Sequence, residues 1–71
     1  MPKFPGLSGA KIVRALEKLG FVVARQSGSH TVMKRGDQGC VVPNHKEVKI
    51  GTVNGVLRQA GVSTQEFSKA L

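Results

Sequence analysis

Tryptophan and tyrosine are absent from the sequence, cysteine occurs once, and acidic side chains number four. The single cysteine, Cys40, permits no internal disulfide. One cysteine and two histidines are also few ligands for a structural zinc site. The four carboxylates are scattered, which disfavours a metal-dependent nuclease. Phe21 and Phe67 have the spacing of core residues, so only Phe4 is left for stacking on bases. These shortages argue against a metal centre and against recognition by stacked bases.

Long apolar runs are missing as well. No stretch approaches the ~18 consecutive apolar residues that cross a membrane, and the first residues lack the apolar segment of a secretory signal. A chain of 71 residues leaves no room for separate cofactor and substrate domains. We expect one domain over residues 1–71 with an N-terminal arm at residues 1–7. A reducing cytoplasm, where a lone thiol stays free, is the expected location.

Positive charge is what the sequence has in excess. Eleven Lys and Arg residues against four Asp and Glu residues give a formal net charge of +7. Such a surplus on a small domain favours a polyanionic partner, which is a nucleic acid, an anionic membrane surface or an acidic protein. A basic composition that serves only solubility is the alternative.

The apolar pattern predicts a helix that begins after Ser8 and ends at Gly20. The Ser8 hydroxyl is suited to cap the first turn, and Leu7 and Ile12 have the spacing of a hydrophobic staple. One face of this helix is apolar. The opposite face carries basic residues three and four positions apart, Lys11, Arg14 and Lys18.

Three segments of strand character follow, at residues 21–26, 30–35 and 40–42. Residues 36–39 have the composition of a four-residue hairpin connection. Pro43 ends the third strand because it cannot donate to a ladder. The pattern predicts a three-stranded antiparallel meander. Residues 44–50 are then polar and basic, either a loop or the start of a helix, and are followed by a helical stripe of Val53, Val56, Leu57 and Ala60.

Ser63 and Glu66 have capping-box spacing and predict a short last helix over residues 64–71, which docks through Phe67 and Leu71. The order is α-β-β-β-α with a short C-terminal helix. We expect an α+β fold whose helices cover one face of the sheet and leave the other face open. Double-stranded-RNA-binding domains share this arrangement.

His30 is the most suggestive residue for chemistry. Strand alternation puts it on the same face as Lys34, which is the open face if the opposite face packs against the helices. An imidazole can exchange a proton with a ribose 2′-hydroxyl or a leaving oxygen, and nearby cations stabilise charge on the phosphate. An ordinary surface histidine is the alternative. The hypothesis is a catalytic His30, supported by Gly28, Ser29, Arg25, Lys34 and His45.

Several side chains have competing interpretations. His45, in the basic loop, is a second acid or base, a phosphate contact or a solvated side chain. Cys40 is a nucleophile or, as its Cys-Val-Val context favours, a small buried side chain. Basic residues form either a surface that follows phosphates, with salt-dependent binding, or a solvated face. The residues predicted to bind RNA are Lys11, Arg14, Lys18, Arg35, Lys46 and Lys49.

Four motifs occur along the chain in a characteristic order. They are Gly20-Phe21 with Arg25 and Gly28-Ser29-His30, then Val42-Pro43-Asn44-His45, then Gly51-Thr52-Val53, and last Arg58-Gln59-Ala60-Gly61. In this order and spacing they resemble the HicA (YcfA-like) toxin family over nearly the whole chain. Val53, where leucine is commoner in the family, is a conservative departure.

The resemblance implies a toxin of a type II toxin–antitoxin system. It implies a double-stranded-RNA-binding-domain-like fold, mRNA cleavage without a metal or organic cofactor, and a HicB-type antitoxin that holds the toxin inactive. The chain is then a monomer alone or a hetero-oligomer with its antitoxin. The family's functional histidine falls on His30, and the role of His45 stays open. A non-catalytic double-stranded-RNA-binding module of the same fold is the alternative, and a protein that binds only an acidic partner is a third.

Overall fold

The computed structural model describes residues 7–71, so Phe4 and most of the predicted arm lie outside the described residues. The elements are α1 (Gly9–Lys18), β1 (Val22–Ser27), β2 (His30–Arg35), β3 (Gln38–Pro43), α2 (Ile50–Ala60) and α3 (Thr64–Ala70). This order confirms the α+β fold that the sequence predicts.

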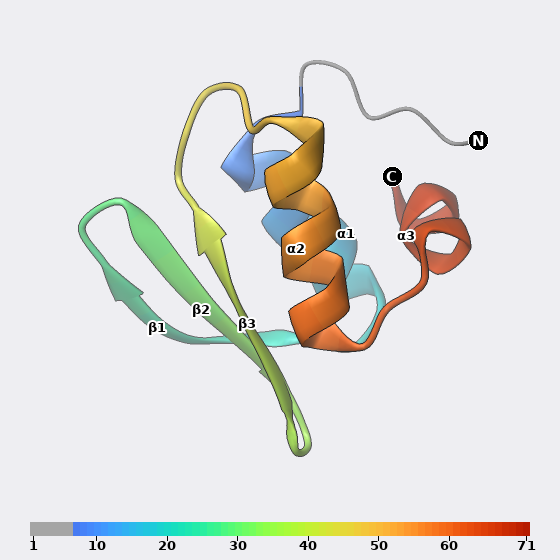
Figure 1. Ribbon diagram of the computed structural model, residues 1–71. Coiled ribbons are helices and arrows are strands. Elements are labelled where there is room, and N and C mark those ends of the chain that lie inside the picture. The colour runs from blue at the N-terminus through green and yellow to red at the C-terminus, as the bar shows by residue number, and fades with distance from the viewer. Residues whose placement is uncertain (1–6) are drawn as a thin grey trace.

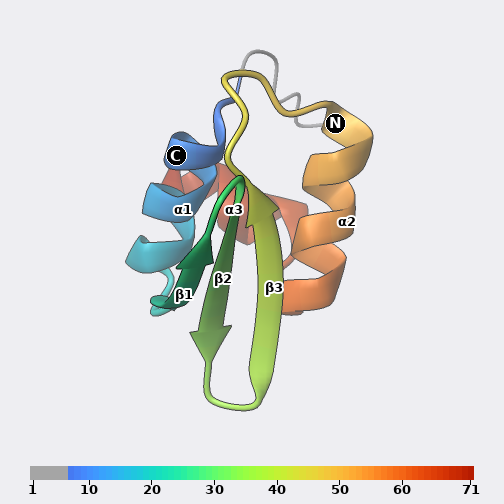
Figure 2. The ribbon, with the colours of Figure 1, turned by 90° about the vertical axis from the view of Figure 1, so that its left-hand side faces the viewer.

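The described strands form one antiparallel sheet in the order β1-β2-β3. Helices α1 and α2 both lie on one face of this sheet, and the other face is open (Figure 1). Helix α3 packs behind them, on the side away from the sheet (Figure 2). Between these layers lies the core, whose largest fully buried side chains are Phe21, Phe67, Ile12, Leu16, Met33, Leu57, Val42 and Val53.

Helix α1 begins as predicted. The Ser8 hydroxyl accepts a hydrogen bond from the Lys11 N–H at 3.2 Å, and Leu7 and Ile12 are both buried. The Leu7 carbonyl also accepts from the Val48 N–H at 2.7 Å. Leu7 precedes the first element but is part of the packed domain, in agreement with the predicted Leu7–Ile12 staple.

The second hairpin is tighter than predicted. Gln38 pairs with Arg35, so the connection consists of residues 36–37 and β3 begins two residues before Cys40. Gly36 has a φ of +59°, which a two-residue hairpin turn requires at its first position. The four-residue connection is wrong because a ladder uses backbone groups, and residues of turn-like composition can still pair through them.

The chain between β3 and α2 is a loop, since α2 begins only at Ile50. The capping box of Ser63 and Glu66 is present at the start of α3. Phe67 is fully buried, but Leu71 is 50% exposed and Ala70 packs in its place, so the predicted docking through Leu71 is wrong. Helix α3 ends at Ala70, which leaves Leu71 beyond the last turn. None of the helices within residues 7–71 is long and apolar enough to span a membrane.

Candidate active site

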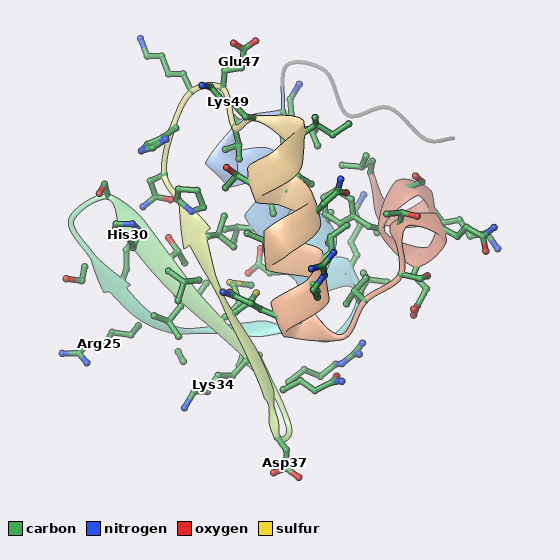
Figure 3. All side chains as sticks on the ribbon, in the orientation of Figure 1. Arg25, His30, Lys34, Asp37, Glu47 and Lys49 are labelled. Atoms are coloured by element: carbon green, nitrogen blue, oxygen red, sulfur yellow. The ribbon has the colours of Figure 1, made fainter. Side chains whose placement is uncertain are left out.

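His30 lies at the first position of β2, exposed on the open face of the sheet as predicted. Gly28 and Ser29 form the turn before it, and Gly28 has a φ of +55°. The Ser29 Oγ lies 3.4 Å from the His30 Nδ1, where it can help to orient the imidazole. Figure 3 shows Arg25, His30 and Lys34 projecting from the sheet on the side away from α1 and α2. The structure therefore brings these three side chains together on one face of the sheet.

A β-bulge in β1 determines the position of Arg25. Val23 pairs with Met33 before the bulge, and Arg25 pairs with Val32 after it. Val32 belongs to the same face as His30, whereas unbroken alternation from Val23 would turn Arg25 toward the helix side of the sheet. The extra residue in β1 thus brings the guanidinium to the open face.

The loop that carries His45 leaves the sheet beside His30. Pro43, the last residue of β3, is the cross-strand partner of His30. The next residue, Asn44, donates its backbone N–H to the Ser29 carbonyl at 2.6 Å, which extends the pairing by one step past the strand. The backbone of His45 therefore lies at the same corner of the sheet as the Gly-Ser-His turn.

Side-chain and helix contacts then fix this loop. The Thr31 hydroxyl donates to the Asn44 Oδ1 at 3.0 Å, and the Gly9 N–H at the start of α1 donates to the His45 carbonyl at 2.9 Å. Helix and loop approach so closely that a Cβ at Gly9 would overlap the Pro43 carbonyl oxygen. The backbone of His45 is held by the fold, while its side chain remains exposed.

The two histidines line one open pocket of about 490 Å³ between the sheet and the loop. Its polar lining comes from His30, His45, Glu47, Lys49 and Thr52, and its apolar lining from β3 and the loop. In Figure 3, Glu47 and Lys49 lie on the loop between β3 and α2, at the end of the molecule opposite Asp37. The pocket thus combines two groups that can transfer protons with a cation that can contact a phosphate.

The comparison with known families agrees with this geometry. The model of a family described as the HicA toxin of bacterial toxin–antitoxin systems matches residues 9–62, which is more than half of the 71 residues. The chain belongs to the HicA toxin family. It is therefore the toxin of a toxin–antitoxin system, and it has a cognate antitoxin as a partner. A search of curated proteins found no match to the chain.

The basic residues of this HicA toxin fall on different surfaces. Lys49 lines the pocket with His30. Lys46 follows His45 in the chain, and these two residues line a second, neighbouring pocket. The three cations of α1 instead line a groove between α1 and the end of α3, which is on the helical side of the molecule: Lys11, Arg14 and Lys18. The fold brings the loop cations to the candidate site and leaves the α1 cations elsewhere.

Arg35 has a structural position in the HicA fold. Its guanidinium donates to the Leu19 carbonyl at 2.9 Å and to the Gln38 Oε1 at 3.0 Å, and lies 4.6 Å from the centroid of the Phe21 ring. Arg35 is on the same face of β2 as Met33, not that of His30. The guanidinium donors of Arg35 hold the end of α1 against the hairpin, so they are engaged within the fold.

The nucleophile interpretation of Cys40, which the sequence leaves open, has little support in the HicA structure. Cys40 is buried on the core side of β3, and this burial raises the pKa of its thiol to about 11, so the thiol stays protonated at neutral pH. Within residues 7–71, no three His, Cys, Asp or Glu side chains are grouped so that they could hold a metal ion. The small buried side chain, not the nucleophile, is the interpretation that the structure supports for Cys40.

Three residues that line the HicA pocket or hold its loop in place were not predicted as site residues. Asn44 fixes the loop, and Glu47 and Thr52 line the pocket. Asn44 and Thr52 occur in the family motifs, but the sequence assigned none of the three a role at the site. Asn44 follows Pro43 directly before a histidine, which is a detectable signal for a fixed turn. Local sequence does not place Glu47 and Thr52 in the pocket, because both reach it only when the loop folds back toward α2.

Proposed function

We propose that this toxin is an endoribonuclease that cleaves mRNA in the cytoplasm, with His30 as a general acid or base. The observation that carries the proposal is the position of His30. It is exposed on the open face of the sheet and lines a pocket that also holds His45 and Lys49. A histidine exchanges protons near neutral pH, and the reaction at an RNA phosphate needs such an exchange at the 2′-hydroxyl or at the leaving oxygen.

Cations around His30 support the second requirement of this reaction, which is to stabilise the negative charge that develops on the phosphate. Lys49 lines the pocket, and Arg25 and Lys34 project from the same sheet face. Cations placed where charge develops lower the barrier of the chemical step. In this proposal the acid–base and charge-stabilising roles all come from side chains, and no metal or organic cofactor takes part.

The antitoxin of this toxin is proposed to be of the HicB type and to inhibit by covering the His30 face. That face carries exposed cations and the exposed apolar side chains Val22 and Val41, so an acidic surface with an apolar centre would complement it. The toxin is then a monomer alone and part of a hetero-oligomer with its antitoxin. We expect diethyl pyrocarbonate to modify His30 more slowly in the complex than in the free toxin. Equal rates would contradict inhibition by occlusion.

The first experiment compares inducible expression of the parent, of His30→Ala and of Gln65→Ala. Gln65 is exposed on α3, away from the site, and provides a matched control. We expect growth arrest and RNA fragments on a denaturing gel from the parent and from Gln65→Ala only. Circular dichroism of purified His30→Ala checks that the variant folds.

Two results would overturn the proposal. Cleavage by His30→Ala at the parental rate would remove His30 from the chemistry. Tight, salt-sensitive RNA binding by the parent without any cleavage products would identify a non-catalytic RNA-binding module of the same fold.

A further inference from the structure

Two imidazoles line one pocket, and only one of them has a role in the function proposed above. His30 comes from the Gly-Ser-His turn, and His45 comes from the loop after β3. Cleavage of RNA by its own 2′-hydroxyl needs two proton transfers, one at the attacking oxygen and one at the leaving oxygen. A single fixed imidazole is suited to one of these positions, because attacking and leaving oxygens lie on opposite sides of the phosphorus.

We propose that His45 is a second catalytic residue, and that His30 and His45 divide the two proton transfers between them. This inference rests on the proposed ribonuclease function and specifies its chemistry. The substrate is an RNA strand with a free 2′-hydroxyl at the cleaved linkage. The products are a 2′,3′-cyclic phosphate on one fragment and a 5′-hydroxyl on the other.

The step balances without an external reagent. One imidazole accepts the proton of the 2′-hydroxyl as the bond from O2′ to phosphorus forms. The bond from phosphorus to O5′ breaks, and the other imidazole, which enters the step as imidazolium, gives its proton to O5′. The two histidines finish in exchanged protonation states, and proton exchange with water restores them.

The backbone geometry favours His45 for this role over a solvated loop side chain. The His45 carbonyl accepts from the Gly9 N–H, and the preceding Asn44 is held by the Thr31 hydroxyl and by the Ser29 carbonyl. Ser29 is also the neighbour of His30, so one network holds the backbone beside both histidines. Catalysis needs positioned groups, and this network restrains the backbone from which the His45 imidazole extends.

The surroundings of the two histidines suit a phosphate between them. Lys49 shares the pocket lining, and Lys46 adjoins His45. Glu47 is the one carboxylate among the described pocket residues, and it is the competing candidate for a second proton-transfer group. The experiment below therefore includes Glu47→Gln beside the histidine variants.

Substitution of His45 is expected to leave the fold intact. The side chain is exposed, and the hydrogen bond that anchors this residue uses its backbone carbonyl, which alanine retains. His45→Ala should unfold at the same urea concentration as the parent. His45→Gln, which keeps polarity without acid–base chemistry, serves as a second variant.

The test uses an oligoribonucleotide that spans a cleavage site mapped with the parent, in two forms. One form has the natural 5′-oxygen at the cleaved linkage, and the other has a bridging 5′-sulfur, which leaves without protonation. On the natural substrate we expect His45→Ala to lower the single-turnover rate about 10²- to 10⁴-fold, the usual contribution of a general acid or base, with an unchanged Kd for the RNA. On the sulfur substrate one of the two variants, His30→Ala or His45→Ala, recovers to within about tenfold of the parent and the other does not. The recovered variant identifies the general acid.

The possible results separate the two proposals. Two results would overturn the role of His45 and leave the ribonuclease proposal standing. One is cleavage by His45→Ala at the parental rate. The other is recovery of the cleavage rate on the sulfur substrate by Glu47→Gln and by neither histidine variant. Cleavage of an all-deoxy oligonucleotide, or fragments with a 5′-phosphate, would overturn the 2′-hydroxyl chemistry. Absence of cleavage by the parent on any RNA would overturn both proposals.

Discussion

Gly9 shows how one residue holds the candidate site together. It occupies the first position of α1 and is buried against the chain that leaves β3. Its N–H donates to the His45 carbonyl, and a Cβ would overlap the Pro43 carbonyl oxygen and lie 3.0 Å from the Asn44 Cα. A side chain here would push backbone against backbone, so the close approach that positions His45 requires glycine.

We predict opposite effects for two glycine-to-alanine substitutions. Gly9→Ala should lower the free energy of unfolding by about 1–3 kcal/mol, because the helix and the loop must move apart. Gly55→Ala, within α2, should raise it by about 0.5–1 kcal/mol, because alanine has the higher helix propensity and no atom lies within 4 Å of the added Cβ. Urea unfolding followed by circular dichroism measures both. A stabilised Gly9→Ala would show that the loop can move away from α1 without loss of unfolding free energy.

Cys40 makes stability depend on pH in the alkaline range. Burial raises the pKa of its thiol from 9.0 to about 11. Between these values the unfolded chain loses the proton and the folded chain keeps it, so the free energy of unfolding falls as pH rises from 9 to 11. The parent should lose about 2 kcal/mol more than Cys40→Ala between pH 8 and pH 10.5. Equal losses in urea titrations at both pH values would contradict this assignment.

At the scale of elements, α3 closes the core from the side away from the sheet. Its capping box fixes the first turn, and Phe67 is fully buried beneath α1 and α2. Leu71 lies beyond the last turn and contributes to the wall of the α1–α3 groove. The helix therefore depends on one large anchor, whereas the spacing of its apolar residues suggests two.

We predict that the two apolar positions of α3 differ strongly on substitution. Phe67→Ala should cost about 3–5 kcal/mol of unfolding free energy, since it removes a fully buried ring. Leu71→Ala should change stability by less than about 0.5 kcal/mol. Melting temperatures from differential scanning calorimetry compare the two. A comparable cost at both positions would mean that Leu71 packs more deeply in solution.

At the scale of the whole molecule, two groups of described basic side chains lie on different sides. The loop cations Lys46 and Lys49 adjoin the two histidines, whereas the α1 cations line a groove beside α3. Helix α3, which forms one side of this groove, lies behind α1 and α2 and away from the open sheet face (Figure 2). A short RNA strand bound at the histidines would contact the first group and not the second.

This division predicts different salt dependences for two double variants. Lys46→Gln with Lys49→Gln should reduce the slope of log Kd against log salt for a short single-stranded RNA by about 1.4, which corresponds to two phosphate contacts. Lys11→Gln with Lys18→Gln removes the same charge and should leave the slope unchanged. Fluorescence anisotropy at several salt concentrations measures both. A reduced slope in the α1 variant would extend the RNA path to the helical side.

Local chemistry in the sequence determined the elements and most of their ends. The Ser8 cap, the capping box of Ser63 and Glu66, and the alternation in β2 are properties of neighbouring residues, so they were readable without a structure. The same alternation placed His30 and Lys34 on the open face, since burial of Met33 leaves only one side of that strand exposed. Family membership was also readable, because short motifs carry it.

Tertiary structure decided which distant residues meet. The bulge that turns Arg25 to the open face reflects pairing between strands, and local composition does not specify that register. The pocket shared by His30 and His45 depends on Gly9, Thr31 and Asn44 contacting across three elements. Arg35 and Lys46 are equally basic in the sequence, and only the packing of Phe21 and the end of α1 gives the first a structural position. Such contacts join residues far apart in the chain, so only the folded backbone determines them.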